Sequence, residues 1–368
     1  MKRQNNRKPI RKQQNANTLA GNIFQQAYGP GPAPSTLPYQ MIYDNAYNPI
    51  TLNRVAITYA YMTHSVIQRA INQPVEDALR GGFTIKSDQL DEQEIETLTM
   101  YLQTSGTIEV LKAALGWADL FGGAGLIINT DQDPKTPLDV DAITPNNNIG
   151  FIDADRWELT LTILNFKKDD VPYNFYNNPI HHSRVIRLLG KEAPSFLRQR
   201  LQGWGMSKLE RMMRPLNAAF KTEDVIYELL DEAKIDVFGI QGFNDNILAS
   251  AASNQVVKRL QIMNMQKNYH RALLLDKEDV YDQKQITFSG LAEIMKENRI
   301  NQAAACNMPI AKLFGMGSSG FSSGEDDIEN YNAMIESEIR PKAHKAAAKI
   351  IPLVCRHLFG FAPDDCLS

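Results

Sequence analysis

The stretch Trp117-Ala-Asp-Leu-Phe-Gly-Gly-Ala-Gly-Leu-Ile-Ile128 contains the junction on which the fold depends. Apolar residues recur at helical spacing up to Leu120, and from Phe121 to Ile128 the run is apolar apart from its glycines. This predicts a helix over residues 108–120 followed by a short buried strand, with the glycines allowing close backbone packing. A helix that passes directly into a buried strand predicts a mixed fold.

The residues before this stretch predict further helices. Apolar residues follow helical spacing over residues 52–79, and Pro74 is expected to kink that helix or divide it in two. Gly81-Gly82 should end it, and a strand should start at Phe83-Thr84-Ile85. Another helix is expected after Asp91.

The residues after the stretch alternate between strand and loop signals up to about residue 200. Strand-like pieces at residues 159–164, 173–176 and 185–189 lie among segments rich in Pro, Asn and Asp. Together with the helices they predict an α+β fold with long loops.

The chain becomes strongly helical after Gly205. Ser207-Lys-Leu-Glu210 has capping-box spacing and predicts a helix start, with a bend at Pro215. Further elements are expected in this order: a strand over 235–240, a helix over 244–267, β-like pieces at 271–275 and 285–288, a helix over 290–306 and a long helix over 325–358.

Composition narrows the class of protein. Of 368 residues, 43% are hydrophobic and 22% charged, which can fill a sizeable core, and no apolar run approaches the roughly 20 residues of a membrane span. No secretory signal follows the basic N-terminus. The three cysteines are too scattered for a disulfide framework or a zinc site, so we expect no metal and a reducing cytosol during assembly.

The charge is unevenly distributed. The first twelve residues contribute +6 and residues 13–43 contain no charged side chain, so the remainder of a chain at −3 carries −9. Residues 1–40 are interpreted as a disordered basic arm, which either binds nucleic acid or acidic partners or only aids solubility. The acidic remainder suits a surface that DNA passes without adhering, although ordinary solubility charge explains it equally well.

One glycine motif resembles a nucleotide site. Gly315-Met-Gly317-Ser-Ser-Gly320 fits G-x-G-x-x-G, but the preceding residues 301–314 are helical rather than a buried strand. The acidic cluster Glu325-Asp326-Asp327 would repel phosphate, and it is explained better as the start of a helix, with Ser322 and Glu325 at capping-box spacing. We therefore interpret the segment as a loop, not a cofactor cradle.

No enzyme signature is present. The sequence lacks the P-loop, the G-x-S-x-G elbow and H-E-x-x-H. In His181-His182-Ser183-Arg184 the neighbouring side chains are expected on opposite faces of a strand, with Arg184 anchoring a neighbour. We expect no catalytic residue and no cofactor.

Five blocks occur in an order that resembles the portal, or head-to-tail connector, proteins of tailed phages, over about residues 40–360. They are Ile71-Asn-Gln-Pro-Val-Glu-Asp-Ala-Leu-Arg-Gly-Gly82, Trp117-Ala-Asp-Leu-Phe-Gly-Gly-Ala-Gly-Leu126, Ile180-His-His-Ser-Arg-Val-Ile-Arg187, Gly203-Trp-Gly-Met-Ser-Lys-Leu-Glu210 and Cys306-Asn-Met-Pro-Ile-Ala-Lys-Leu-Phe-Gly315.

The resemblance implies a portal-like subunit of a twelve-membered ring. Its parts would be an α/β wing over residues 41–243, stem helices over 244–267 and 290–306, a clip over 268–289, a tunnel loop over 307–324 and a long wing helix within 325–368. The helical crown that often follows in this family would be absent or truncated.

The resemblance also assigns residues to roles. Those facing DNA in the tunnel loop would be Met316, Ser318, Ser319, Phe321, Ser322 and Ser323. Those contacting terminase or adaptor from the clip would be Tyr269, His270, Arg271, Lys277 and Asp279. Those packing the stem would be Ile247, Ala251, Leu260 and Ala304. Since no Lys or Arg lies between Leu313 and Tyr331, the loop could touch DNA without gripping its phosphates.

The implied partners are copies of this chain, double-stranded DNA passing through the channel without sequence specificity, the terminase large subunit, the head–tail adaptor and the major capsid or scaffold protein. The implied location is a virion vertex, after assembly in the bacterial cytoplasm. The alternative within virions is a head–tail adaptor or minor head protein, and outside them a nucleotide-dependent enzyme built on the glycine loop.

Overall fold

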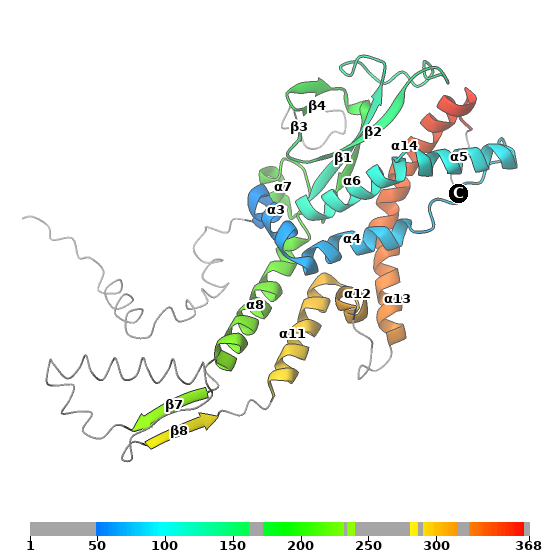
Figure 1. Cartoon of the computed structure of the whole chain (residues 1–368). Helices are drawn as coiled ribbons and strands as arrows, with labels where there is room; N and C mark the ends of the chain where they lie inside the picture. The colour runs from blue at the N-terminus through cyan, green and yellow to red at the C-terminus, as the bar shows by residue number, and fades with distance from the viewer. Residues whose placement is uncertain are drawn as a thin grey trace, which may run out of the picture. The chain divides into compact units, whose positions relative to one another are not determined.

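The computed structural model describes residues 49–161, 172–231, 234–239, 280–285, 290–315 and 324–363, shown in Figure 1. Residues 50–368 form one of two units of the chain, and every element below belongs to it. The unit combines helices with small antiparallel sheets, which confirms the mixed helix-and-sheet prediction.

The central sheet has the order β2-β1-β6 and is antiparallel throughout. Strand β1 (Gly123–Thr130) pairs with β2 (Ile149–Asp155) and β6 (Val185–Leu189). Helix α6 (Thr107–Phe121) ends at Gly122, whose φ of 85° turns the chain directly into β1. The predicted helix-to-strand junction is confirmed, while β2 was not predicted.

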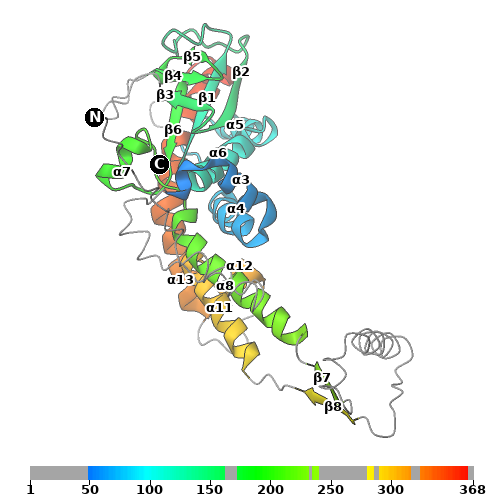
Figure 2. The same cartoon turned by 90° about the vertical axis from the view of Figure 1, so that its left-hand side faces the viewer.

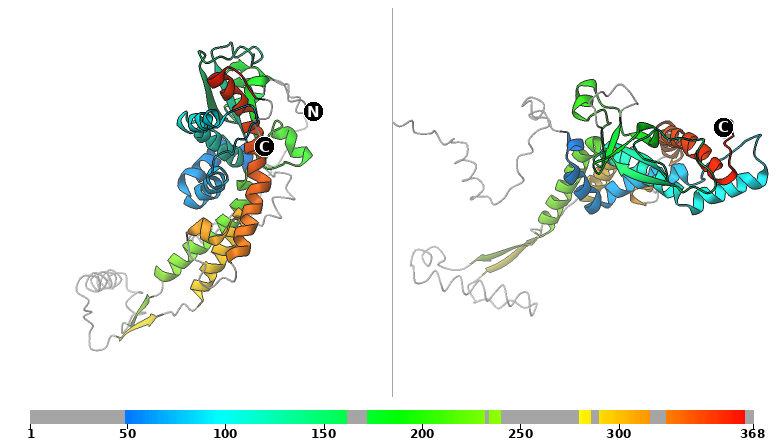
Figure 3. Two further views of the ribbon diagram at one scale, coloured as in Figure 1. Left: turned by 90° about the vertical axis from the view of Figure 1, so that its right-hand side faces the viewer. Right: turned by 90° about the horizontal axis from the view of Figure 1, so that it is seen from above.

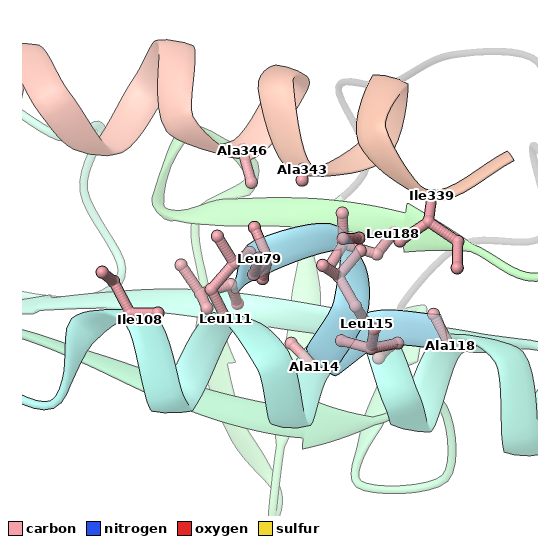
Figure 4. Close-up of a cluster of buried hydrophobic side chains, with 14 of the residues drawn as sticks. Leu79, Ile108, Leu111, Ala114, Leu115, Ala118, Leu188, Ile339, Ala343 and Ala346 are labelled. Carbon is pink, nitrogen blue, oxygen red and sulfur yellow. The ribbon is translucent and has the colours of Figure 1, made fainter. Parts of the chain in front are cut away.

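Helices α4 (Ser65–Leu79), α5 (Glu92–Thr104), α6 and α14 (Arg340–Phe359) share one hydrophobic core with this sheet. Figure 4 shows Leu79 of α4, Leu111 and Leu115 of α6, Leu188 of β6 and Ala343 of α14 converging in that core. Small residues on α14, among them Ala343 and Ala346, let it lie close to its neighbours.

The N-terminal helical region differs from the prediction at Pro74. The break falls at His64, an extended residue between α3 (Arg54–Thr63) and α4, and α4 continues through Pro74. A proline removes the amide that would bond to the carbonyl four residues earlier, here Ala70. The Lys208 ammonium donates to that carbonyl at 2.9 Å, which explains why the helix is not broken.

Residues 83–85 are also not a strand, although Ile85 is buried. The helix after Asp91 is confirmed as α5, with a complete capping box between Asp91 and Glu94.

A second small sheet has the order β3-β4-β5, formed by β3 (Leu159–Leu161), β4 (Tyr173–Phe175) and β5 (Asn178–Ile180). The next residues form the 3₁₀ turn η2 (His182–Arg184), so the His181 and His182 rings lie 4.1 Å apart rather than on opposite faces. The anchoring role of Arg184 is confirmed: its buried guanidinium donates to Thr130, Gln132 and the Thr136 carbonyl.

The helical half begins after α7 (Ser195–Arg200) with α8 (Leu209–Asp231), which contains Pro215. The predicted capping box is wrong in its partners. The Leu209 amide donates to the Ser207 hydroxyl at 3.1 Å, and Glu210 instead accepts from Thr51 at 2.8 and 2.9 Å. This ties α8 to the turn η1 (Ile50–Leu52) at the start of the unit.

Helix α8 lies beside α11 (Leu291–Cys306), as Figures 1 and 2 show. Strands β7 (Lys234–Gly239) and β8 (Val280–Gln285) pair antiparallel in the stretch between them. The expected strand over 235–240 and helix over 290–306 are thus confirmed. The expected helix over 244–267 and the segment 271–275 lie outside the described residues, as does the arm over 1–40.

The C-terminal helical region contains α12 (Ile310–Phe314), α13 (Gly324–Met334), the π-helical turn η3 (Ile335–Ile339) and α14. The expected long helix over 325–358 is confirmed, with the π turn inside it; Figure 3 shows its course past the sheet. No helix in the described ranges has the length and apolar character to cross a membrane.

Candidate functional site at the base of the 316–323 loop

The loop predicted to face DNA joins two described helices. Helix α12 ends at Gly315, whose φ of 68° is a left-handed cap, and α13 begins at Gly324. The predicted loop residues Met316, Ser318, Ser319, Phe321, Ser322 and Ser323 lie outside the described residues, and so does the proposed Ser322 cap. The structure therefore describes the two ends of this loop.

A single carboxylate connects the helices at both ends of this loop to α4. Asp77 of α4 accepts a hydrogen bond from the Lys312 ammonium of α12 at 3.1 Å and from the Tyr331 hydroxyl of α13 at 2.9 Å, both on Oδ2. Its other oxygen accepts from Gln73 at 3.1 Å. The Asp77 side chain is 11% exposed, so these bonds form in a partly dry environment. One residue thus fixes the entry and the exit of the loop.

The charge state of Asp77 follows from these contacts. Burial alone would raise the pKa of its carboxyl, but the hydrogen bonds from Lys312 and Tyr331 and the Lys312 charge outweigh it and hold that pKa below the usual value. Burial and the nearby Asp77 charge raise the pKa of Tyr331. Tyr331 therefore stays a hydrogen-bond donor and Asp77 an acceptor at neutral pH.

A groove of about 950 Å³ opens beside this anchor. It is bounded by α11, α12 and α13 and lined mainly by apolar side chains. They include Ala304, Met308, Ile310 and Ile328, and the polar positions include Asn307, Lys312, Asp327 and Asn330.

A second charged cluster, next to the π turn, anchors α14 to α6. Asp119 of α6 is buried and accepts from the Lys342 ammonium at 3.0 Å. Lys191 pairs with Glu338 within the π turn, and the buried Lys208 lies near Asp119. Burial would raise the pKa of Asp119, but Lys342 and Lys208 outweigh it and lower that pKa. Burial lowers the pKa of Lys208 despite the opposing charge of Asp119.

A backbone seam holds this cluster in place. The Gly190 amide donates to the Gly122 carbonyl at 3.0 Å, and Lys191 and Met206 exchange backbone bonds of 3.0 and 2.7 Å. A Cβ on Gly122 would lie 2.4 Å from the Gly205 carbonyl oxygen, and one on Gly205 2.6 Å from that of Lys191. Two of the five resembling blocks, those containing Gly122 and Gly205, therefore meet at this seam, because only glycine permits the approach.

The other predicted site residues are divided between the described and undescribed parts. Ala304 lies on α11 and lines the groove. The clip residues Tyr269, His270, Arg271, Lys277 and Asp279, and the stem residues Ile247, Ala251 and Leu260, lie outside the described residues. Across the described ranges, no cluster of His, Cys, Asp or Glu could hold a metal ion.

Sequence reasoning missed Asp77, Lys312 and Tyr331 as a unit. Asp77 and Lys312 stand inside quoted blocks, but nothing in either block indicates that they pair. A partner for Asp119 could have been predicted, because a carboxylate within the apolar block Trp117–Leu126 needs a hydrogen-bonding or charged partner if it is buried.

Comparison with known proteins identifies the family. The sequence model described as "Phage portal protein" matches residues 55–367 of this chain. The chain therefore belongs to the phage portal protein family, which confirms the resemblance.

The chain is also similar to curated proteins and to solved structures. An uncharacterized protein of Haemophilus influenzae is 30% identical over 305 residues, covering 79% of this chain and 67% of that protein. The anti-CBASS protein Acb1 of Sphingomonas paeninsulae is 25% identical over 309 residues, covering 77% of this chain and 49% of the relative. The chain thus spans about half the length of that relative.

A chain in the solved virion of a native gene transfer agent (GTA) particle has a similar fold. Its TM-score is 0.51 at 13% identity, with 89% of this chain and 88% of that chain covered. At this identity the likeness concerns the fold alone.

Proposed function

We propose that this chain is the portal subunit of a phage-type particle, assembling into a ring, with twelve members as the family resemblance implies, at one capsid vertex. DNA would pass through the ring during packaging, be retained, and leave through it at ejection. Membership of the phage portal family supports this role, as does a fold shared with a chain of a virion. The role requires no catalytic residue and no cofactor.

The observation that carries the proposal is the anchoring of the loop ends. Residues 316–323 contain no Lys or Arg, and both ends of the loop are bound to one carboxylate, Asp77. A loop that touches moving DNA needs a firm base, and it also needs few cations, because each neutralised phosphate strengthens the grip on the duplex. The anchor and the composition together suit a channel loop.

The paired helices suit the stem of such a subunit. Helices α8 and α11 lie side by side, and we propose that α8 takes part in the stem with α11. Residues 268–289, which include β8, would then supply the clip with the five residues assigned to it. There the ring would meet first the terminase large subunit and later the head–tail adaptor, while the wing would face the capsid or scaffold protein.

The loop assignment is tested by changing one aromatic side chain. Phe321→Lys adds a cation per subunit at the proposed channel surface, so we expect rings to assemble normally while DNA packaging or retention falls. Phe196→Lys is the matched control, because Phe196 lies on α7 and is 67% exposed. Negative-stain microscopy and packaged DNA per particle are the readouts. Equal packaging by both variants, or failure of Phe321→Lys to form rings, would contradict the assignment.

A further inference from the structure

Helix α3 has an apolar face that no described residue of the chain covers. Val55, Tyr59 and Met62 recur at intervals of four and three residues, so they lie on one side of the helix. Their exposed fractions are 78%, 68% and 71%, whereas Ile57 and Ala60 on the opposite side are buried. Single exposed apolar side chains are ordinary, but a row of three large ones on one helix is typical of a protein-binding surface.

The chemistry of this α3 face indicates what should cover it. The face carries no charge, because the one charged residue of the helix is Arg54 at its first position, and Arg54 pairs with Asp155 and Glu158. The Tyr59 hydroxyl forms no hydrogen bond with any described residue. A buried tyrosine hydroxyl usually finds a hydrogen-bond partner. The covering surface should therefore be apolar and should offer one acceptor at its edge.

The groove between α11, α12 and α13 has this chemistry. It is lined mainly by apolar side chains, among them Met308 and Ile328. Its charged lining consists of one residue of each sign, and the cation, Lys312, is already bound to Asp77 at 3.1 Å. The anion, Asp327, is exposed and forms no ion pair with a described residue, so its carboxylate is free to accept a hydrogen bond.

The α3 face and the groove also agree in size, and they lie apart in one chain. Val55 to Met62 spans about 10 Å of helix at 1.5 Å per residue. A groove of about 950 Å³ has room for three such side chains. Figure 1 shows α3 and α13 at opposite ends of α4, and the α3 face is exposed in the single chain. The groove of the same chain therefore does not take it, whereas the proposed ring brings a second copy to every subunit.

We propose that the apolar face of α3 in one subunit docks into the α11–α12–α13 groove of the next copy of this chain. Val55 and Met62 would enter the apolar interior, and the Tyr59 hydroxyl would donate to Asp327 at the rim. This rests on the proposed ring, and it names the two surfaces that join its subunits. A helix that enters an apolar groove through side chains at i, i+4 and i+7 is a common mode of recognition. Two different patches that complement each other make a head-to-tail contact, which repeats around a closed ring.

Charged substitutions on the two surfaces test the contact. Met62→Lys or Ile328→Glu alone buries an unpaired charge at every contact, so each should need at least about tenfold more protein to form rings. Ring formation is measured by analytical ultracentrifugation over a dilution series. Both side chains are exposed in the single chain, so the unfolding midpoint of each variant should match the wild type. A chain with both substitutions should recover ring formation, because each contact then joins opposite charges.

A matched control places the same cation on another exposed helix. Met100 on α5 is 64% exposed and belongs to neither surface, so Met100→Lys should form rings at the wild-type concentration. Ammonium sulfate should favour assembly of the wild type, because sulfate strengthens the burial of apolar surface.

A cross-link locates the contact directly. Met62→Cys combined with Ile328→Cys should give a ladder of disulfide-linked multimers when assembled rings are oxidised, while each single variant shows the background from the native cysteines. Met62→Lys rings that form as readily as the wild type, or assembled double-cysteine rings that give no ladder, would overturn the docking proposal and leave the portal function standing. Absence of wild-type rings under all conditions would contradict both.

Discussion

The glycine seam beside β1 and the base of the 316–323 loop are held together in opposite ways. At the seam, Gly122, Gly190 and Gly205 bring backbone against backbone with no room for a side chain. At the loop base, Asp77 joins α4, α12 and α13 through side chains alone. The close backbone packing at the seam permits a single conformation. The hydrogen bonds to Asp77, in contrast, can be removed one at a time. Both would serve the proposed portal subunit, in which the glycine seam would stay rigid while the 316–323 loop contacts DNA.

The largest effect is expected at the seam. Gly122→Ala places a Cβ 2.4 Å from the Gly205 carbonyl oxygen at a φ of 85°, so the free energy of unfolding should fall by about 4 kcal/mol or more, or the protein should not fold. Chemical denaturation measures this. Gly150→Ala is the control, because its Cβ would meet open space, and its stability should be nearly unchanged. Equal stability of the two variants would show that the seam is not tightly packed.

An intermediate effect is expected at the buried charges. Asp119→Asn removes the carboxylate while Lys342 and the buried Lys208 remain, so the free energy of unfolding should fall by about 3 kcal/mol. Asp141→Asn also removes one carboxylate from an ion pair, with Arg356, but Asp141 is 88% exposed and the loss should be far smaller. Matching losses would mean that burial of the Asp119 cluster contributes nothing.

The smallest effect on stability is expected at the loop base. Asp77→Asn weakens the bonds to both loop ends and should cost about 1–3 kcal/mol, while Tyr331→Phe removes one bond and should cost about 1 kcal/mol. Protease cleavage within 316–323 should rise more for Asp77→Asn than for Tyr331→Phe. Faster cleavage of Tyr331→Phe than of Asp77→Asn would show that Asp77 is not the residue that anchors the loop ends.

The effects of Asp77→Asn and Gly122→Ala on stability should differ in their pH dependence. The folded pKa of Asp77 is lowered, so its contribution is present above the unfolded value of 3.8 and is lost as the pH falls through the lower folded value. The difference in stability between wild type and Asp77→Asn should therefore shrink on acidification below that value. The cost of Gly122→Ala is steric and should not follow this titration. A pH-independent Asp77→Asn difference would contradict the assigned ion pair.

The sequence predicted those structural features that depend on residues close together in the chain. The change from helical spacing to a continuous apolar run at Phe121 located the α6–β1 junction correctly, because both patterns are local. Pro74 does not divide the helix, one of the two outcomes expected for it, and the lysine that satisfies the freed Ala70 carbonyl stands 138 residues away in the sequence. Asp77 could not be predicted as an anchor, because its partners lie 235 and 254 residues further along the chain. The family resemblance, carried by blocks in series, supplied the architecture that local patterns do not.

The most direct test of the portal assignment is a cryo-electron microscopy map of the purified full-length ring. In the proposed ring the α12–α13 junction, between Gly315 and Gly324, should lie closest to the axial hole, with α5 and the small β3-β4-β5 sheet further out. A ring whose hole is lined by the wing sheet, with the Asp77 anchor at its outer edge, would contradict it.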